Sequence, residues 1–286
     1  MQLLLAKPVA EKIQIDVQTR AEKFLSRTQR KPHLAVVLVG QNPASVIYTK
    51  KKGETAVKWG FDHQSIVFPE SATPHEVRAA VEKLNADPKV DGILIQRPLP
   101  PSFSEEEVLY WVLPEKDVDA FHPENAGRLQ LGLPCFQPCT PAGIIEILKY
   151  YEIEIAGRIA CVIGRSSIVG KPMAALLLQE NATVFHCHSK TSDLESIAKQ
   201  AEILIVAAGK PHLVGGAYIK SGAVVIDVGI HRDAQNKVIG DVRFDEAASI
   251  ASAITPVPGG VGPMTIAILL KNTAFAAERR ANLLHF

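Results

Sequence analysis

Alternating blocks of apolar and polar residues divide the chain into a repeating order of helices and strands. Between residues 8 and 30 the apolar positions recur at about helical spacing, which predicts an amphipathic helix with a charged outer face. The run His33–Val39 is continuously apolar, as expected of a strand buried on both sides. Ser45 is expected to cap a helix that extends to about Trp59 and stops at Gly60.

The same order continues through the next forty residues. Strands are predicted at 65–68 and 90–96, and the capping box Thr73-Pro74-His75-Glu76 starts the helix between them. The proline-rich loop 97–101 cannot continue the second of these strands. Because ligands bind at the carboxyl ends of strands in an open α/β sheet, we expect Gln96 and this loop to lie near a ligand.

The second half of the chain repeats the pattern. After a helix predicted from Thr140 to Tyr151, the predicted strands are 159–163, 182–187, 203–207 and 223–228. Helical segments separate these strands, and this order is typical of a parallel sheet with right-handed crossovers. A last apolar helix is predicted from Met264 to about Glu278. The sequence therefore predicts an α/β protein with two domains.

A glycine turn opens the predicted sheet of the second domain. The segment Gly164-Arg165-Ser166-Ser167-Ile168-Val169-Gly170 follows a predicted strand and precedes a predicted helix. Such a turn presents backbone N–H groups and the positive end of a helix dipole to a phosphate. The match to the dinucleotide fingerprint is imperfect, because Ser166 stands at the third position, where the fingerprint has glycine. The alternative is a purely structural turn between strand and helix.

The residues at the end of the next strand favour NADP over NAD. An acidic residue about 20 positions after the glycine turn binds the ribose 2′-hydroxyl of NAD in this fold. Here Ser189, Lys190 and Thr191 occupy that place, and they suit the additional 2′-phosphate of NADP. Arg165 could pair with the same phosphate through two hydrogen bonds. The alternative is that residues 189–191 form a solvated turn.

Two segments of the first domain contain candidate catalytic residues. Tyr48 and Lys52 are four residues apart on one predicted helix and so share a face. Adjacent lysines and partial burial would lower the pKa of Lys52 and suit it to acid/base chemistry; the alternative is an exposed basic helix. Asp117 and Asp119 lie in a loop, where a carboxylate could accept two hydrogen bonds from an aminopyrimidine ring. Either aspartate could equally be a turn or cap residue.

Composition excludes several classes of ligand and favours one cellular compartment. The 31 Lys and Arg against 30 Asp and Glu give a formal charge of +1, which argues against a nucleic-acid surface. The sequence has no apolar stretch near the roughly 20 residues of a membrane span, and its start lacks the pattern of a signal peptide. The cysteines and histidines lack metal-ligand spacing, so we predict free buried thiols and no metal. We expect a cytoplasmic protein that binds small molecules.

Five motifs, in order over nearly the whole chain, resemble the bifunctional methylenetetrahydrofolate dehydrogenase/cyclohydrolase (FolD) family. They are Tyr48-x-x-x-Lys52, Asp91-Gly92-Ile93-Leu94-Ile95-Gln96-x-Pro98-Leu99-Pro100, Pro114-Glu115-Lys116-Asp117-Val118-Asp119, Gly164-Arg165-Ser166-x-Ile168-Val169-Gly170-x-Pro172 and Thr255-Pro256-Val257-Pro258-Gly259-Gly260-Val261-Gly262-Pro263-Met264-Thr265. The resemblance implies a homodimeric enzyme of one-carbon metabolism with two α/β domains around a cleft. Residues 1–140, completed by the C-terminal helix 264–286, would form the catalytic, folate-binding domain, and residues 141–263 the Rossmann-like NADP-binding domain.

The resemblance also implies two reactions and a function for each motif residue. The enzyme would oxidise 5,10-methylenetetrahydrofolate to 5,10-methenyltetrahydrofolate and hydrolyse that product to 10-formyltetrahydrofolate. Lys52 would activate water with Gln96 holding it, Tyr48 would position folate and the lysine, and Asp119 would bind the pterin amino group. The remaining family contacts would be to folate through Pro258, Gly259, Gly260 and Val261, and to NADP through Gly164, Arg165, Ser166, Ser189 and Ile230.

Three residues beside the expected site depart from the family pattern. Arg97 stands where an apolar residue is usual, Ala120 where glycine is usual, and His231 where asparagine is usual. Arg97 could lower the pKa of Lys52 further or engage the glutamate tail of folate, and Ala120 is expected to need a negative φ. We hypothesise an altered balance of the two activities without loss of fold. The alternatives are a dehydrogenase with weak or lost cyclohydrolase activity and a non-catalytic nucleotide-binding protein of the same fold.

Overall fold

The computed structural model describes residues 1–284, which form two compact units. The three-stranded unit contains Lys12–Gln137 and the chain from Ile266 onward. The six-stranded unit contains Met1–Glu11 and Pro138–Thr265. The structure therefore assigns the first eleven residues differently from the predicted domain 1–140.

The pairing of the first strand explains this assignment. Strand β1 (Gln2–Leu3) pairs in parallel with β11 (Ala253–Ile254) at the edge of the larger sheet. Helix α1 (Ala6–Thr28) then continues into the three-stranded unit, and α10 (Gly262–Arg280) does the same near the other end of the chain. Pairing between residues some 250 positions apart leaves no local pattern, so the sequence did not indicate it.

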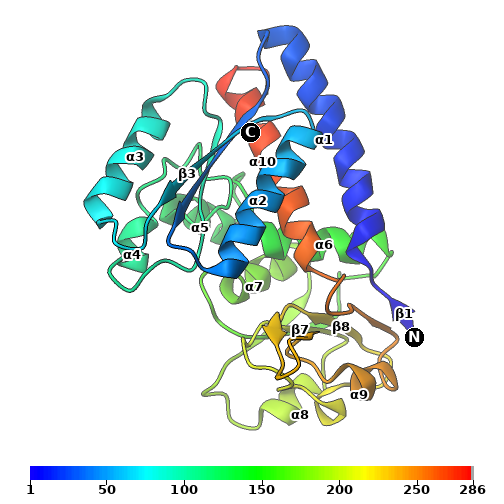
Figure 1. Ribbon diagram of the computed structural model, residues 1–286. Helices are drawn as coiled ribbons and strands as arrows, with labels where there is room; N and C mark the ends of the chain where they lie inside the picture. The colour runs from blue at the N-terminus through cyan, green and yellow to red at the C-terminus, as the bar shows by residue number, and fades with distance from the viewer. Residues whose placement is uncertain (285–286) are drawn as a thin grey trace. The chain divides into compact units, whose positions relative to one another are not determined.

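The smaller sheet has the strand order β3-β2-β4 with parallel pairing throughout. Its unit also contains, in chain order, β2 (His33–Val39), α2 (Pro43–Lys58), β3 (Asp62–Phe68), α3 (Pro74–Ala86), β4 (Gly92–Ile95), α4 (Glu105–Val108) and α5 (Pro123–Gln130). Because β3 and β4 flank β2 on opposite sides, right-handed crossovers place α2 and α3 on opposite faces of the sheet (Figure 1). Strand β2 has the predicted bounds and is buried along almost its whole length.

Two helix starts show how local sequence sets the ends of elements. The predicted capping box is confirmed: Thr73 Oγ1 accepts a hydrogen bond from Glu76 N at 3.3 Å, and Glu76 Oε2 accepts one from Thr73 N at 2.8 Å. The predicted cap at Ser45 is wrong. Asn42 caps α2 by accepting hydrogen bonds from two N–H groups of the first turn, and a proline follows it at the first helical position.

Strand β3 also differs from its prediction, since it begins at Asp62 and not at Ser65. Its first three residues are polar, yet they pair with β2 from His33 onward. Backbone pairing in a parallel ladder does not require apolar side chains, so the hydrophobic pattern marked only the later part of the strand.

The larger sheet has the order β1-β11-β8-β7-β5-β6, and every pair is parallel. Its unit also contains α6 (Cys139–Tyr150), β5 (Ile159–Ile163), α7 (Gly170–Gln179), β6 (Thr183–Cys187), α8 (Leu194–Ala198), β7 (Ile203–Val206), a 3-10 turn (Gly216–Tyr218), β8 (Val224–Asp227), the antiparallel pair β9 (His231–Arg232) and β10 (Val238–Ile239), and α9 (Phe244–Ala248). The chain passes from β5 to β6 on one side and then crosses to β7 on the other. The strand order therefore reverses at β5, the place where doubly wound sheets bind ligands.

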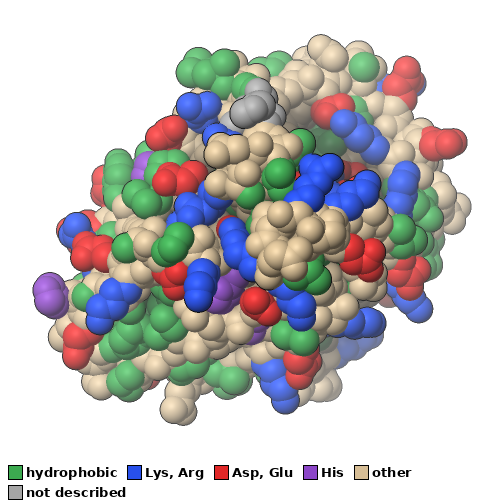
Figure 2. All heavy atoms as spheres, turned by 90° about the horizontal axis from the view of Figure 1, so that it is seen from above, with side chains coloured by type: hydrophobic (Ala, Val, Ile, Leu, Met, Phe, Trp, Pro, Cys, Tyr) green, Lys and Arg blue, Asp and Glu red, His purple; other side chains and the backbone are tan. Residues whose placement is uncertain are grey.

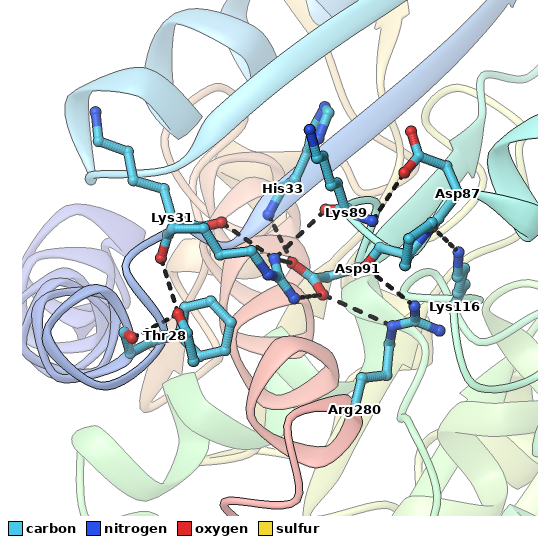
Figure 3. Close-up of polar contacts among 11 residues, drawn as sticks. Thr28, Lys31, His33, Asp87, Lys89, Asp91, Lys116 and Arg280 are labelled. Carbon is cyan, nitrogen blue, oxygen red and sulfur yellow. Dashed lines mark hydrogen bonds and ion pairs between the residues drawn. The ribbon is translucent and has the colours of Figure 1, made fainter.

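Ion pairs attach the C-terminal helix to the three-stranded unit. Arg20 of α1 pairs with Glu278 of α10 where these helices lie side by side (Figure 1). The buried carboxylate of Asp91 accepts hydrogen bonds of 2.6 and 2.8 Å from Arg30 and lies 3.7 Å from the Nε of Arg280 (Figure 3). One side chain thus connects segments from both ends of the chain.

Charged side chains of both signs are interspersed on the face shown in Figure 2. This agrees with the formal charge of +1, and that face has no extended region of a single sign. Within residues 1–284, no helix has the length and apolar character needed to span a membrane.

Candidate active site and cofactor turn

One face of helix α2 is buried, and Lys52 lies on it. The buried residues of this helix are Ser45, Thr49, Lys52, Gly53 and Ala56. Their spacing of three and four positions is that of a single helical face. Lys50 and Lys51, in contrast, are exposed. The interpretation of this segment as a uniformly solvated basic helix is therefore wrong for Lys52.

Lys52 is held by Gln96, which follows the last residue of β4. The Nζ of Lys52 donates to Gln96 Oε1 at 2.9 Å, and Gln96 Nε2 donates to the carbonyl oxygen of Arg97 at 2.6 Å. These two contacts orient the amide, because its oxygen faces the amine and its nitrogen faces the carbonyl. The Oγ of Ser45 donates to the same Arg97 carbonyl at 3.3 Å. Two residues that the sequence singled out separately therefore meet in the structure.

The depth of helix α2 over the sheet depends on Gly53. A Cβ at this position would lie 2.5 Å from Nε2 of His63 in β3. The His63 ring is itself fixed, with Nδ1 3.1 Å from the Leu34 carbonyl oxygen and Nε2 2.9 Å from Ser65 Oγ. Any larger residue would push the helix outward and move the adjacent Lys52 with it.

Asp119 lines a pocket beside strand β4. The pocket is a small, half-open hollow, and its walls include Ile93, Ile95, Val108, Arg97, Asp117 and Asp119. Apolar walls with a few polar groups are typical of small-molecule sites. Tyr48, one turn before Lys52 on α2, is partly exposed and is not among the residues that line this pocket.

The two aspartates of the predicted loop have different surroundings. Asp117 is buried, and its Oδ2 accepts hydrogen bonds from His122 N at 2.7 Å and from Asn125 Nδ2 at 3.0 Å. Burial raises the pKa of Asp117 to about 6. Asp117 thus stabilises the loop, whereas Asp119 is only half-buried.

The expectation that Ala120 needs a negative φ is wrong, because its φ is +62°. Its N–H donates to the carbonyl oxygen of Asp117 at 3.0 Å, and this turn holds the residue in the left-handed region. An alanine there costs about 1 kcal/mol relative to glycine, which has no Cβ to clash. The loop therefore keeps the backbone shape that glycine would allow, and Asp119 keeps its position.

The guanidinium of Arg97 forms an ion pair with Glu105. Its Nη1 donates to Glu105 Oε2 at 2.8 Å, and its guanidinium carbon lies 5.7 Å from the centre of the Phe121 ring. Its backbone carbonyl, not its guanidinium, contacts the group that holds Lys52. Arg97 also lines the pocket that contains Asp119, as does Phe121, over whose ring the guanidinium lies.

In the six-stranded unit, Gly164 and Gly170 permit a turn too tight for other residues. A Cβ at Gly164 would lie 2.1 Å from the carbonyl oxygen of Ala207, and one at Gly170 would lie 2.1 Å from that of Gly164. Ser166 Oγ accepts hydrogen bonds from the N–H groups of Val169 and Gly170 at 3.2 and 3.3 Å. Ser166 thus closes the turn itself, which accounts for a serine at the third position of the fingerprint.

The end of β6 lies against this turn. His186 Nε2 is 2.9 Å from the carbonyl oxygen of Gly164, and Gly164 N donates to the carbonyl oxygen of Cys187 at 2.9 Å. The place where the adenosine ribose binds in doubly wound folds is therefore adjacent to the glycine turn.

The residues after β6 form a closed turn that leaves two side chains exposed. His188 N donates to Thr191 Oγ1, and Thr191 N donates to the carbonyl oxygen of His188, both at 2.9 Å. Thr191 thus serves the turn, while Ser189 and Lys190 are exposed, as is Arg165. An exposed hydroxyl and two exposed cations beside a phosphate-type turn fit a dinucleotide with a 2′-phosphate.

A buried carboxylate joins the loops after β7 and β8. Asp241 Oδ1 lies 2.7 Å from His231 Nε2, and its Oδ2 accepts hydrogen bonds from the N–H groups of Ala208 and Gly209 at 2.7 and 2.9 Å. His231 follows Ile230, whose side chain is 54% exposed. Sequence reasoning missed Asp241, and its local sequence contains no signal that could have revealed it.

The predicted folate-binding turn precedes most of α10, in the six-stranded unit. Gly259 has a φ of +107°, and Gly260 N donates to the carbonyl oxygen of Pro256 at 2.8 Å. A Cβ at Gly260 would lie 2.6 Å from that oxygen, so this turn too depends on a missing side chain. Val261 is buried.

Within the described part of the chain, no cluster of three or more His, Cys, Asp or Glu side chains is arranged to hold a metal ion. All four cysteines are free thiols, of which three are buried and Cys135 is half-buried. Cys161 and Cys187 lie on neighbouring strands with their sulfurs 3.8 Å apart, and burial raises the pKa of the Cys161 thiol. These buried thiols are structural.

Comparisons with known proteins agree with this geometry. Residues 4–119 match the catalytic domain of tetrahydrofolate dehydrogenase/cyclohydrolase, and residues 138–281 match the NAD(P)-binding domain of the same family. Bifunctional protein FolD of Acetivibrio thermocellus is 48% identical over 281 residues, with 98% of each chain covered. The crystal structure of the FolD enzyme from Campylobacter jejuni superimposes with a TM-score of 0.95 at 45% identity, over 98% of this chain and 99% of that one. The FolD of Trypanosoma brucei, complexed with NADP cofactor and inhibitor, gives a TM-score of 0.93 at 36% identity, with 98% of each chain covered.

Proposed function

This chain belongs to the tetrahydrofolate dehydrogenase/cyclohydrolase family, and we propose that it oxidises 5,10-methylenetetrahydrofolate with NADP⁺ and hydrolyses the product. In the oxidation, the methylene carbon loses a hydride to the cofactor and becomes a methenyl cation. In the hydrolysis, water adds to that carbon, a proton is lost, and ring opening gives 10-formyltetrahydrofolate. The observation that carries the proposal is the buried amine of Lys52, held by Gln96 at the carboxyl end of a strand.

Lys52 is the acid/base of the hydrolytic step. Water that attacks the methenyl carbon becomes acidic, and an amine within reach accepts its proton and then stabilises the adduct as an ammonium. Gln96 Oε1 takes one of the N–H donors and so orients the amine. The oxidation requires no protein base, because lone pairs on the substrate nitrogens expel the hydride.

Tyr48 and Asp119 bind the substrate. Tyr48 lies one helical turn before Lys52, with its ring partly exposed, and positions the folate. Asp119, in the wall of its pocket, accepts hydrogen bonds from the amino group and a ring N–H of the pteridine. On the six-stranded unit, the turn 258–261 contributes backbone contacts to folate.

NADP supplies the hydride acceptor when it is bound. The turn at Gly164 and Ser166, tight enough to exclude a Cβ, would hold the pyrophosphate. Arg165 and Ser189, both exposed, would hold the 2′-phosphate, and the exposed side chain of Ile230 would offer an apolar contact. The end of β6 carries no acid at this place, and this supports NADP over NAD.

The enzyme acts as a homodimer in the cytoplasm. Strand β3 pairs with β2 on one side and has no strand partner on the other among the described residues, and its Val67 is exposed, as is Val57 of α2. An open edge of seven residues that ends in the apolar run Ile66-Val67-Phe68 suits pairing with a second copy. Free thiols are typical of a reducing compartment. Light scattering of the pure protein tests the dimer, and replacement of Val67 by lysine is expected to give monomers.

One assay tests the reaction. The protein is mixed with methylenetetrahydrofolate and NADP⁺, and reduced cofactor and methenyl product are followed together. Reduced cofactor with only transient methenyl product is expected. Lasting methenyl accumulation would leave a dehydrogenase without cyclohydrolase activity, and absence of reduced cofactor would leave a non-catalytic binding protein.

A further inference from the structure

Arg97 lines the pocket that contains Asp119, and its guanidinium lies over the ring of Phe121, another residue of the wall. Arg97 and Asp119 line the same hollow of the three-stranded unit, together with apolar groups that include Ile95 and Phe121. An ionised carboxylate can accept hydrogen bonds but not donate them, and a guanidinium can donate them but not accept them. The pocket therefore offers an acceptor and a donor to a flat polar ligand.

The position of Arg97 is fixed at both ends of the residue. Its carbonyl oxygen accepts hydrogen bonds from Gln96 Nε2 at 2.6 Å and Ser45 Oγ at 3.3 Å. Its guanidinium donates to Glu105 at 2.8 Å and lies over the ring of Phe121. Because Gln96 also holds Lys52, the arginine is positioned by the residues that position the catalytic amine.

The ion pair with Glu105 does not account for the burial of Arg97. The side chain of Arg97 is 17% exposed, whereas that of Glu105 is 70% exposed. An exposed acid contributes little to stability and leaves the desolvation of the arginine largely uncompensated. A guanidinium has five N–H donors, and Glu105 engages Nη1. The other donors suit a ligand that enters the pocket.

We propose that Arg97 determines specificity for the aminopyrimidinone ring of the substrate by donating to its carbonyl oxygen while Asp119 accepts from its amino group and ring N–H. One edge of this ring carries amino, N–H and carbonyl groups in sequence, so it requires acceptors and a donor side by side. Asp117, the other carboxylate of the pocket, already accepts from His122 and Asn125. The inference rests on the proposed function, since it takes the pteridine as the occupant of the pocket.

Binding of tetrahydrofolate to Arg97→Leu, Arg97→Lys and Glu105→Gln, measured by calorimetry, tests the proposal. Loss of a charge-assisted hydrogen bond is expected to weaken binding to Arg97→Leu about 10- to 100-fold, with an intermediate loss for Arg97→Lys. Glu105→Gln removes the ion pair but keeps the donor, so its Kd is expected to change less than about threefold. Affinity for NADP⁺ is expected to stay the same in all variants. Equal losses in Arg97→Leu and Glu105→Gln would show that the arginine serves only the ion pair and would overturn the proposal.

Binding of a second ligand shows whether Arg97 contacts the ring or the glutamate tail of the substrate. Tetrahydropteroate has the same ring system but no glutamate. The loss in Arg97→Leu is expected to be as large for tetrahydropteroate as for tetrahydrofolate. A loss confined to tetrahydrofolate would assign Arg97 to the tail and overturn the proposal. Because the readout is binding, wild-type protein that binds tetrahydrofolate without turnover would contradict the proposed reaction and leave this inference standing.

Discussion

At the scale of single residues, burial separates Lys52 from its neighbours. Lys50, Lys51 and Lys52 have the same side chain, and only the last lies on the buried face of α2. Sequence reasoning could place Lys52 on a helix next to other lysines, but not decide which lysine faced the sheet. That choice follows from the helical phase set by Ser45, Thr49 and Ala56.

Replacement of Lys52 by methionine is expected to abolish the hydrolysis, because methionine fills the same space without a group that can accept a proton. In the coupled assay, methenyl product should then accumulate while cofactor reduction continues. Lys51→Met is the matched control, since it removes an exposed lysine from the same helix. Normal hydrolysis in Lys52→Met would refute the acid/base assignment.

The raised pKa of Asp117 predicts that the free energy of unfolding depends on pH. Burial raises its pKa from 3.8 to about 6 in the folded protein, so between these values the folded state holds a proton that the unfolded state lacks. Its contribution to the free energy of unfolding is therefore largest below pH 4 and falls by roughly 3 kcal/mol as the pH rises through 6.

Asp117→Asn removes this titration. Oδ2 accepts the hydrogen bonds from His122 N and Asn125 Nδ2, so an amide oxygen can replace it. The Phe121 N–H also bonds to the carboxylate, and the change at that bond shifts the stability of the variant equally at both pH values. Urea unfolding at pH 4 and pH 7 is expected to show the variant gaining about 2 kcal/mol relative to wild type between these values. A constant difference between the two proteins would show that Asp117 does not titrate in this range.

At the scale of elements, Lys116 caps the C-terminal end of helix α3, although the sequence placed it only in a loop rich in turn-forming residues. Lys116 is fully buried, and its Nζ donates to the carbonyl oxygens of Leu84, Asn85 and Asp87 at 2.9, 2.7 and 2.7 Å. These carbonyls at the end of α3 have no partner within the helix. Burial lowers the pKa of Lys116 to about 8, so the amine is still protonated at neutral pH and uses all three of its donors.

Lys116→Met is expected to lower the free energy of unfolding by about 3 kcal/mol, because it leaves the carbonyl groups of Leu84 and Asn85 without a donor and that of Asp87 with only the 3.3 Å bond from Val90 N. Urea denaturation at pH 7 measures this change. Lys83→Met, an exposed lysine in the last turn of the same helix, is the control and should change stability by less than about 0.5 kcal/mol. Similar values for the two variants would contradict the capping function.

Element boundaries were predictable where one local signal was sufficient. The capping box at Thr73 and the continuous apolar strand 33–39 were predicted correctly, since a few adjacent residues specify each. The start of α2 was not, because Asn42 and Ser45 both suit a cap and the chain uses the one that precedes a proline. The left-handed φ of Ala120 was unpredictable, because the contacts of its loop impose it against the preference of alanine.

At the scale of the whole molecule, a buried ion cluster joins distant parts of the chain. Asp91, just before β4, contacts Arg30, which follows α1. It also contacts Arg280, the last residue of α10 (Figure 3). Its carboxylate also accepts a hydrogen bond from His33 N at 3.0 Å. The three-stranded unit is therefore completed only when the C-terminal helix is in place.

Asp91→Asn is expected to lower the free energy of unfolding by about 3–5 kcal/mol, because it leaves two partly buried arginines without a counter-charge. Urea unfolding checks this value. Glu82→Gln breaks the exposed pair with Arg78 and should change stability by less than about 1 kcal/mol. If both substitutions had the same small effect, the cluster would contribute no more than a surface ion pair.

By itself the sequence determined the α/β class, the central strands, the glycine turn and the family of this protein, because each depends on adjacent residues or on ordered motifs. The tertiary structure alone decided that Lys52 is buried against Gln96, that Asp119 and Arg97 share a pocket, and that Asp91, Lys116 and Asp241 hold distant segments together. Those outcomes depend on helical phase, desolvation and pairing between remote segments. A linear pattern of apolar and polar residues contains none of these quantities.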